Sequence, residues 1–258
     1  NPSKLRQNRK VYRMLLRRFA NHIRTQNWTA VVLDFIIVVV GILIAFQITN
    51  WNDGRQDRRD EQRYLAELAV NLEADLAQIN AGQEASLQRL AAAEAILNEA
   101  APDLERTLFF APIERDLPSP GGFQEYPYAY LTSYFFMVSS SSTFDELIQT
   151  GNIGVISNRL LVKDLTSYYD RVHRQRGDDD IMLTQAAGML DWTREKGLGM
   201  SDRATLLETI NLAKSDQSFL GFVKMASFLA YFQYSRLTDI ETDAENLLAA
   251  VEAEMDTR

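Results

Sequence analysis

The chain has 258 residues but no cysteine, and it has only two histidines, His22 and His173. The lack of cysteine excludes disulfide bonds, thiol catalysis and thiolate metal sites. Two histidines so far apart do not suggest a metal cluster, and the sequence contains no phosphate-binding glycine loop, nucleophile elbow, zinc-protease motif or EF-hand loop. We therefore expect a protein that is not an enzyme and that binds no cofactor and no metal.

Acidic residues are missing from the first 24 positions, which carry eight lysines and arginines. Residues 53–258 instead carry 19 basic and 34 acidic residues, a net charge of −15. A segment with this negative balance should bind neither nucleic acid nor anionic lipid. The positive-inside rule places the basic N-terminal side in the cytoplasm.

A long apolar run follows the basic segment. Residues 30–48 are apolar except for Asp34 and Gln47, and Trp28 and Trp51 flank the run about 35 Å apart along a helix. This distance suits one membrane-spanning helix with an aromatic anchor at each interface. No small-residue cleavage site follows the run, so a retained signal anchor is predicted rather than a cleaved signal peptide.

Residues 1–27 form the expected cytoplasmic or interfacial segment. If they are helical, apolar and basic side chains fall on different faces, as in an amphipathic helix lying on a membrane. The residues expected to contact anionic lipid are Lys10, Arg13, Arg17, Arg18 and Arg24. The alternative is that these charges only set the topology.

The membrane helix, residues 28–52, carries an unusual face. At 100° per residue, Asp34, Gly41, Ala45 and Asn52 share one side of the helix. Gly41 and Ala45 have the small-xxx-small spacing that lets helices approach closely. A carboxylate facing lipid costs about 2.5–3.5 kcal/mol on insertion scales. The face therefore predicts packing against a second copy of the chain or another integral membrane protein.

Residues 53–101 are expected to form a long membrane-proximal helix. Apolar residues recur there at three- and four-residue spacing: Leu65, Leu68, Leu72, Leu76 and Ile79, then Leu87, Leu90 and Leu97. The interruption near Gly82 favours a bundle helix over a free coiled coil. Residues 102–127, with five of the six prolines, predict an irregular connection, either a surface crossover or a functional loop.

Residues 128–258 are predicted to form helices that pack with residues 53–101, so the fold class is mainly α. Residues 128–138 are aromatic and suit a core. A capping box at Thr143 and Glu146 predicts a helix ending before Gly151, and Ser157 and Gly177 should bound the next helix, over 158–176. Later helices are expected over 180–196, 201–214 and 216–254. The acidic run 178–180 could bind calcium, but a helix start is favoured because the alternating ligand spacing is missing.

Two blocks of the sequence resemble an uncharacterised bacterial family of single-pass membrane proteins. The first is residues 33–52, with an acidic residue, a Gly-Ile-Leu-Ile-Ala core and an Asn-Trp-Asn exit, and the second is residues 144–161, followed by Ser167 to Tyr169. The family usually has glutamate in place of Asp34 and leucine in place of Phe46. The resemblance implies a bacterial inner-membrane protein and implies no activity, ligand or cofactor.

Three functions remain open. The favoured one is a structural or accessory subunit that assembles through its membrane helix, alone or with another membrane protein, and presents a helical periplasmic domain. The second is a stator-like subunit with Asp34 in an ion pathway. The third is a periplasmic helical sensor module, for which a cytoplasmic segment of fewer than 30 residues leaves little room for an output.

Overall fold

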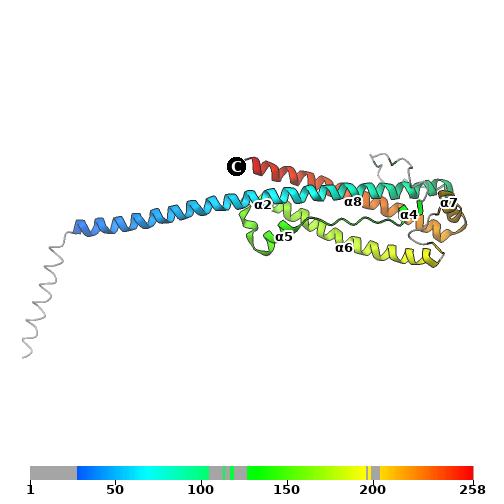
Figure 1. Cartoon of the computed structure of the whole chain (residues 1–258), viewed down its shortest axis with the longest axis horizontal. Coiled ribbons are helices and arrows are strands. Elements are labelled where there is room, and N and C mark those ends of the chain that lie inside the picture. The colour runs from blue at the N-terminus through cyan, green and yellow to red at the C-terminus, as the bar shows by residue number, and fades with distance from the viewer. Residues whose placement is uncertain are drawn as a thin grey trace, which may run out of the picture. The chain divides into compact units, whose positions relative to one another are not determined.

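The computed structural model describes residues 28–104, 113, 117–118, 127–195, 197–198 and 204–257, except for the side chains of residues 176–182, 185–186, 188–190 and 192. Its elements are α2 (Trp28–Ala100), α4 (Pro127–Leu131), α5 (Ser142–Gln149), the 3-10 helix η1 (Asn152–Val155), α6 (Arg159–Glu195), α7 (Leu206–Ser215) and α8 (Gln217–Asp256) (Figure 1). No strand occurs among these described residues, and the predicted mainly α class is confirmed.

The chain divides into two compact units, Asn1–Arg58 and Arg59–Arg258. Helix α2 belongs to both, because it continues without a break for 73 residues from Trp28 to Ala100. The membrane helix and the membrane-proximal helix expected from the sequence are thus one element. No proline interrupts this stretch, and a single glycine such as Gly54 costs a helix only about 1 kcal/mol.

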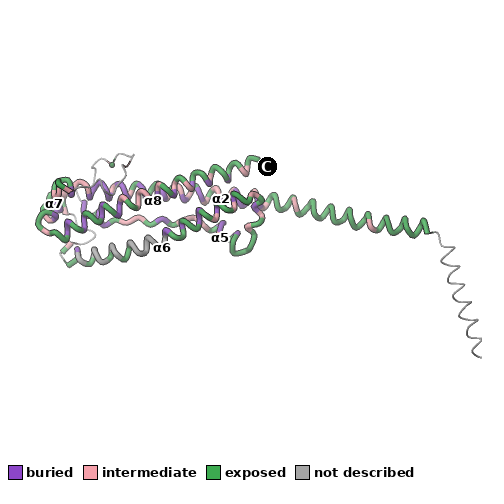
Figure 2. The backbone as a smooth tube through the Cα atoms, turned by 180° about the vertical axis from the view of Figure 1, so that it is seen from behind, coloured by how far each residue is buried: buried purple, intermediate pink, exposed green. Residues whose placement is uncertain are grey.

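Helices α2, α6 and α8 run side by side in the second unit, with buried residues on the sides that face one another (Figure 2). One buried cluster joins the middle of α2 to α5, α6 and the second half of α8, with Leu68, Tyr169 and Ile240 among its members. Another joins the end of α2 to α4, α7 and the first half of α8, with Ile96 and Phe219 among its members. Such a core accounts for the apolar stripe along α2, since an amphipathic helix is stabilised by covering its apolar face.

Two helix starts differ from the sequence-based predictions. Helix α5 begins at Ser142 rather than behind a capping box at Thr143. Asn158, not Ser157, caps α6: its side-chain oxygen accepts from the backbone N–H groups of residues 160 and 161 at 3.1 and 3.2 Å. Buried Glu61 of α2 instead accepts from the Ser157 backbone N–H at 2.6 Å. Ser157, which resembles a cap in the sequence, therefore takes part in a tertiary contact with α2 instead.

The predicted break at Gly177 is wrong, because α6 passes through it and continues to Glu195. A helix tolerates one glycine when its other residues favour helix. The stop before Gly151 is confirmed: α5 ends at Gln149, and Gly151 has a φ of 73°, in the left-handed region that glycine adopts most readily.

Helix α8, expected from about residue 216, begins at Gln217 with Asp216 as its cap. Helix α7 begins later than expected, at Leu206, behind a capping box formed by Thr205 and Glu208. Most of the proline-rich segment 102–127 and the whole of segment 1–27 lie outside the described residues.

Candidate functional site

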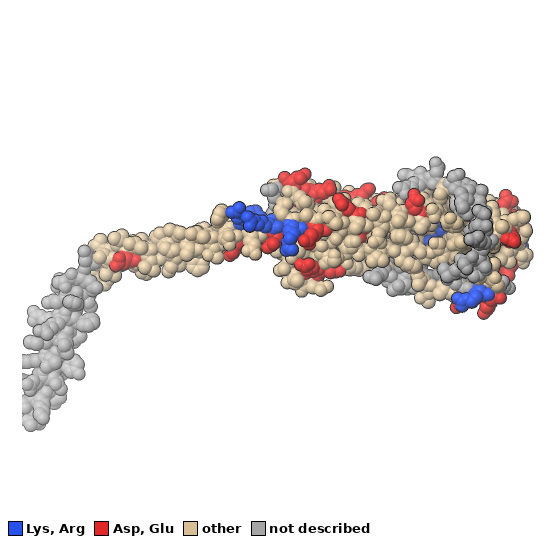
Figure 3. Space-filling model, in the orientation of Figure 1, with Lys and Arg blue, Asp and Glu red and all other residues tan. Residues whose placement is uncertain are grey.

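Among the described residues, α2 is the one helix that is long and apolar enough to cross a membrane, judged by length and composition. Its most apolar 18-residue window has a mean hydropathy of 2.8, and none of that window is buried. Figure 3 shows this part of the helix as an almost uncharged surface. Trp28 and Trp51 are 60% and 64% exposed, and the Arg55 guanidinium lies 5.9 Å from the Trp51 ring centroid.

The four residues of the predicted packing face, Asp34, Gly41, Ala45 and Asn52, all lie in α2 and are exposed in this single chain. A Cβ atom added to Gly41 would meet no atom within 4 Å. The helix thus brings the four residues to one side and leaves that side uncovered. The predicted lipid-contact residues Lys10, Arg13, Arg17, Arg18 and Arg24 lie outside the described part of the chain.

The second unit contains a feature that sequence reasoning missed: an extended segment, residues 133–141, joins α4 to α5 and lies along α2. We call it the strap. Gln78 of α2 holds the strap at both backbone groups of Val138, accepting from its N–H at 2.9 Å and donating to its carbonyl at 2.7 Å. From the other side, Gln233 of α8 donates to the Phe135 carbonyl at 2.6 Å. Side-chain amides thus satisfy backbone groups that a strand partner would otherwise pair.

Asp75 fixes the far end of the strap. Its carboxylate is fully buried and accepts hydrogen bonds from the Ser139 hydroxyl at 2.8 Å, the Ser140 backbone N–H at 2.6 Å and the Tyr168 hydroxyl at 2.9 Å. Charge-assisted hydrogen bonds of this length are the stronger kind, and three of them offset the cost of burying the carboxylate. Asp75 therefore ties α2, the strap and α6 together.

Gly82 lets the strap approach α2 closely. A Cβ atom added there would lie 2.5 Å from the Phe135 ring and 2.8 Å from the Leu237 side chain. Any side chain there would force Phe135 or Leu237 to move. The sequence interruption near Gly82 is thus a packing site inside a continuous helix.

Arg89 is a further buried charge of α2, after Glu61 and Asp75, with 1% of its surface exposed. Its Nη2 atom donates to the Gln233 side-chain oxygen, and its guanidinium carbon lies 4.5 Å from the Tyr134 ring centroid. Burial lowers the pKa of the Arg89 guanidinium and raises the pKa of the Tyr134 hydroxyl. Both ends of the strap therefore meet a buried charge.

A signal for this site exists in the sequence. Eight of the buried residues of α2 follow one another at alternating three- and four-residue steps: Leu65, Leu68, Leu72, Asp75, Ile79, Gly82, Ser86 and Arg89. The first three and the fifth are the expected apolar residues. Finding aspartate, glycine, serine and arginine in the same register marks the positions where the strap, α6 or α8 makes polar contacts or packs closely instead.

Tyr168 and Tyr169 of α6 give the Asp75 site a pH dependence. Burial, followed by the nearby Asp75 charge, raises the pKa of both hydroxyls. In the unfolded chain a tyrosine ionises near pH 10, so below that pH both states are protonated and the stabilisation is complete. Above it, only the unfolded chain releases the proton readily, and stability should fall as pH rises.

We expect the free energy of unfolding to fall above pH 10 by about 1.4 kcal/mol per pH unit for each of the two tyrosines. Urea unfolding of the full chain in mild detergent at several pH values between 8 and 11 measures the slope. The Tyr168→Phe variant should show a shallower slope, whatever its stability at pH 8. Equal slopes in the two proteins would mean that Tyr168 does not titrate as its surroundings indicate.

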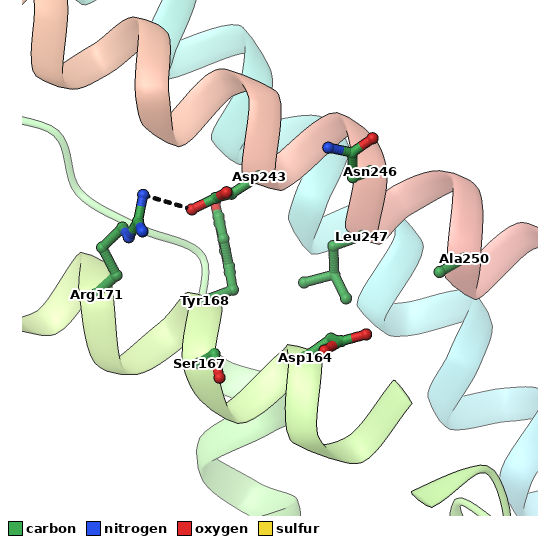
Figure 4. A pocket seen from close by; sticks show the side chains of 8 residues that line it. All are labelled: Asp164, Ser167, Tyr168, Arg171, Asp243, Asn246, Leu247 and Ala250. Carbon is green, nitrogen blue, oxygen red and sulfur yellow. Dashed lines mark ion pairs between the residues drawn. The ribbon is translucent and has the colours of Figure 1, made fainter. Parts of the chain in front are cut away.

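A polar groove lies between α6 and α8, with a volume of about 260 Å³. Figure 4 shows Arg171 of α6 reaching toward Asp243 of α8, and Asp164 and Ser167 of α6 and Asn246 of α8 also line the groove. The Arg171 guanidinium pairs with the Asp243 carboxylate at 2.7 Å, although both side chains are half exposed, so the pair adds little stability. Among the described residues, no group of three or more potential metal ligands occurs.

Residues 34–174 match the family of unknown function DUF6090. No curated protein and no solved structure matches the chain. The matched region begins at Asp34 and includes Asp75, Arg89 and the strap, but it ends within α6, before α7 and α8. It covers more than half of the residues, and the chain belongs to the family DUF6090.

Proposed function

We propose that this protein is a non-enzymatic accessory or scaffold subunit of a bacterial inner membrane. It crosses the membrane once, with a cytoplasmic N-terminal side, and presents residues 59–258 as a helical periplasmic domain. Its membrane helix assembles with a second copy or with another integral membrane protein. The observation that carries the proposal is the uncovered face of Asp34, Gly41, Ala45 and Asn52 on an apolar helix.

Physical chemistry supports assembly through this face. Because lipid cannot hydrogen-bond to a carboxylate, Asp34 gains from a protein partner that offers a donor. Gly41 and Ala45 allow the partner backbone to come close, which strengthens dispersion contacts in a membrane where hydrophobic burial gives no driving force. The basic segment with Lys10, Arg13, Arg17, Arg18 and Arg24 would hold the cytoplasmic side against anionic lipid.

The acidic surface of the second unit supports the same reading. Acidic side chains are scattered over its visible face, with few basic ones among them (Figure 3). Such a surface remains soluble beside an anionic membrane rather than binding to it. A domain held away from lipid is free to present its sides to other proteins.

We expect Gly41→Ile to weaken assembly by about tenfold or more, because the branched side chain keeps the partner backbone at a distance. Native mass spectrometry of the full chain, extracted from its own membrane in mild detergent, measures the stoichiometry and any second subunit. Leu43→Phe is the matched control, since it adds bulk on the opposite side of the helix. Unchanged assembly in Gly41→Ile would refute the proposed interface.

The isosteric variant Asp34→Asn separates assembly from ion conduction. A packing role should tolerate the amide, which still hydrogen-bonds across the interface. If Asp34 belongs to an ion pathway, the complex should persist while its ion-dependent activity is lost. That second outcome would support the stator-like alternative.

The groove between α6 and α8 favours a second candidate, a periplasmic ligand-binding module. Two α6 residues of opposite charge that line it, Arg171 and Asp164, could hold a small polar molecule. The Arg171–Asp243 pair already occupies part of the groove, so the scaffold is the function we favour.

A further inference from the structure

Helix α2 carries basic side chains on one side just after Trp51, where its apolar run ends. At 100° per residue, Arg55 and Arg58 lie within about 40° of Trp51 around the helix axis. The acidic residues at positions 52–60 lie at least about 120° away from Trp51: Asp53, Asp57 and Asp60. Figure 3 shows basic side chains gathered on α2 beyond its uncharged part. We call the side formed by Trp51, Arg55 and Arg58, all in the first unit, the basic face.

Sums of charge hide the basic face. Residues 52–60 contain three arginines and three aspartates, so their net charge is zero. The negative balance of residues 53–258 likewise predicts no binding to anionic lipid, because a sum ignores where each charge lies. A bound phosphate responds chiefly to charges within a Debye length, about 8–10 Å, and the helix sorts those charges by side. The basic face is therefore a local exception to the acidic composition.

Both arginines of the basic face reach back toward the proposed membrane span. The Arg55 guanidinium carbon lies 5.9 Å from the ring centroid of Trp51, one turn earlier in α2. The Arg58 Nη1 atom lies 3.7 Å from a Cβ atom added to Gly54, which is also one turn earlier. Long helical side chains ordinarily point toward the N-terminal end of their helix. On α2 this direction leads to the apolar run.

The guanidinium groups of the basic face fall at headgroup depth. With Trp51 at the interface, the Cα atoms of Arg55 and Arg58 lie about 6 and 10 Å beyond it along the helix axis. A lipid headgroup layer is about 5–8 Å thick on each side of the hydrocarbon core. Because both side chains reach back by about a turn, their charges lie within that layer.

Arg55 and Arg58 have donors to offer a ligand. Both residues are exposed, and neither makes an ion pair with any residue that the structure describes. Arg63 differs, since its guanidinium lies 3.7 Å from the Asp60 carboxylate and 3.9 Å from the Glu67 carboxylate. Guanidinium N–H groups form paired, charge-assisted hydrogen bonds with phosphate oxygens. Two exposed arginines at headgroup depth therefore suit a phosphodiester.

We propose that the basic face binds the phosphate of an anionic phospholipid on the periplasmic side of the membrane. Arg55 and Arg58 hold the phosphate oxygens, and the Trp51 ring keeps the Arg55 guanidinium at the interface. The lipid fixes the depth of α2 where the helix leaves the membrane. This inference rests on the proposed membrane span but not on assembly, because the basic face is centred about 90° from the face of Asp34 and Gly41.

Trp51 itself reports on the lipid beside it. The full chain with Trp28→Phe and Trp192→Phe keeps only this tryptophan and is reconstituted at low ionic strength in vesicles of equal parts phosphatidylcholine and phosphatidylglycerol. Bromine on the acyl chains of one lipid at a time quenches tryptophan fluorescence nearby. Both leaflets have the same composition, so the orientation of the chain does not affect the result. We expect Trp51 to prefer phosphatidylglycerol over phosphatidylcholine by about tenfold or more.

Charge-removing variants assign the preference to the basic face. Arg55→Gln and Arg58→Gln should each lower it by about threefold to fivefold, the effect of one arginine near a charged membrane surface. Arg63→Gln is the matched control, because it removes the same charge from a paired arginine about 18 Å beyond Trp51. That control should keep the full preference. All three side chains are exposed, so the variants should fold normally.

The outcomes separate this inference from the proposed function. Equal quenching by the two brominated lipids would overturn the lipid site and leave the membrane span standing. A full preference in the double variant Arg55→Gln/Arg58→Gln would also overturn it, since the lipid would then be held by other residues. Quenching by neither lipid would mean that Trp51 lies away from the membrane, and both the lipid site and the span would be wrong.

Discussion

Replacing Asp75 with alanine is expected to lower the free energy of unfolding by about 3–5 kcal/mol, the range for breaking a buried, hydrogen-bonded charge network. The variant removes the carboxylate that accepts hydrogen bonds from the Ser139 hydroxyl, the Ser140 N–H and the Tyr168 hydroxyl. The Tyr168 hydroxyl bond is buried, so its donor loses a partner that water cannot replace without opening the core. The strap should detach at this end first.

Urea unfolding of the full chain in mild detergent, followed by circular dichroism, measures the loss. Glu73→Ala is the matched control, because Glu73 is an exposed acid two residues away on the same helix. That control should change stability by less than about 0.5 kcal/mol. Asp75→Asn should fall between the two, since the amide keeps one acceptor oxygen but turns an NH₂ group toward donors. Equal stabilities of Asp75→Ala and Glu73→Ala would show that the network does not hold the strap.

Replacing Gly82 with alanine is expected to cost about 1–3 kcal/mol, although alanine is the better helix former. The added Cβ atom would lie 2.5 Å from the Phe135 ring and 2.8 Å from the Leu237 side chain, closer than real contacts allow. The Phe135 ring packs against the buried cluster, so it can yield only by disturbing that packing. Overpacking therefore outweighs the gain in helix propensity.

The same substitution at Gly221 provides the control with the opposite sign. Gly221 also lies within a helix, α8, but a Cβ atom added there meets nothing within 4 Å. Gly221→Ala should raise stability by about 0.5–1 kcal/mol. The two alanine variants thus differ in sign for a reason found only in the surroundings of each glycine. A stabilising Gly82→Ala would contradict the close packing of the strap on α2.

The helical parts of this protein could be predicted because their signals are local. The apolar run from Trp28 to Trp51 and the stripe that starts at Leu65 indicate helix by periodicity alone. The end of α5 before Gly151 and the start of α8 after Asp216 follow from turn and cap chemistry. Each of these features depends on residues within one or two turns of the chain.

The errors occurred where a distant contact competes with a local signal. Ser157 resembles a cap, but Glu61, 96 positions away in sequence, takes its N–H group. Gly82 resembles an interruption, but it lies where the strap packs against a helix that continues.

The candidate site divides in the same way. Asp34, Gly41, Ala45 and Asn52 share a face by helix geometry, so the sequence alone placed them together. Asp75, Gln78 and Arg89 gave no such indication, although their buried register on α2 is visible once the helix is continuous. Their partners Ser140 and Gln233 lie at least 60 positions away, and sequence spacing carries no information about such contacts.

The sequence by itself determined the helical class, the apolar helix and the charge asymmetry between residues 1–24 and 53–258, because composition and periodicity act locally or as simple sums. Only the tertiary structure decided what each buried charge meets. Asp75 meets three donors, whereas Arg89 meets the Gln233 side-chain oxygen and the Tyr134 ring, although both sit in the same register of α2. Burial and hydrogen bonding depend on what the strap, α6 and α8 bring to each position, and those neighbours are set by packing rather than by proximity along the chain.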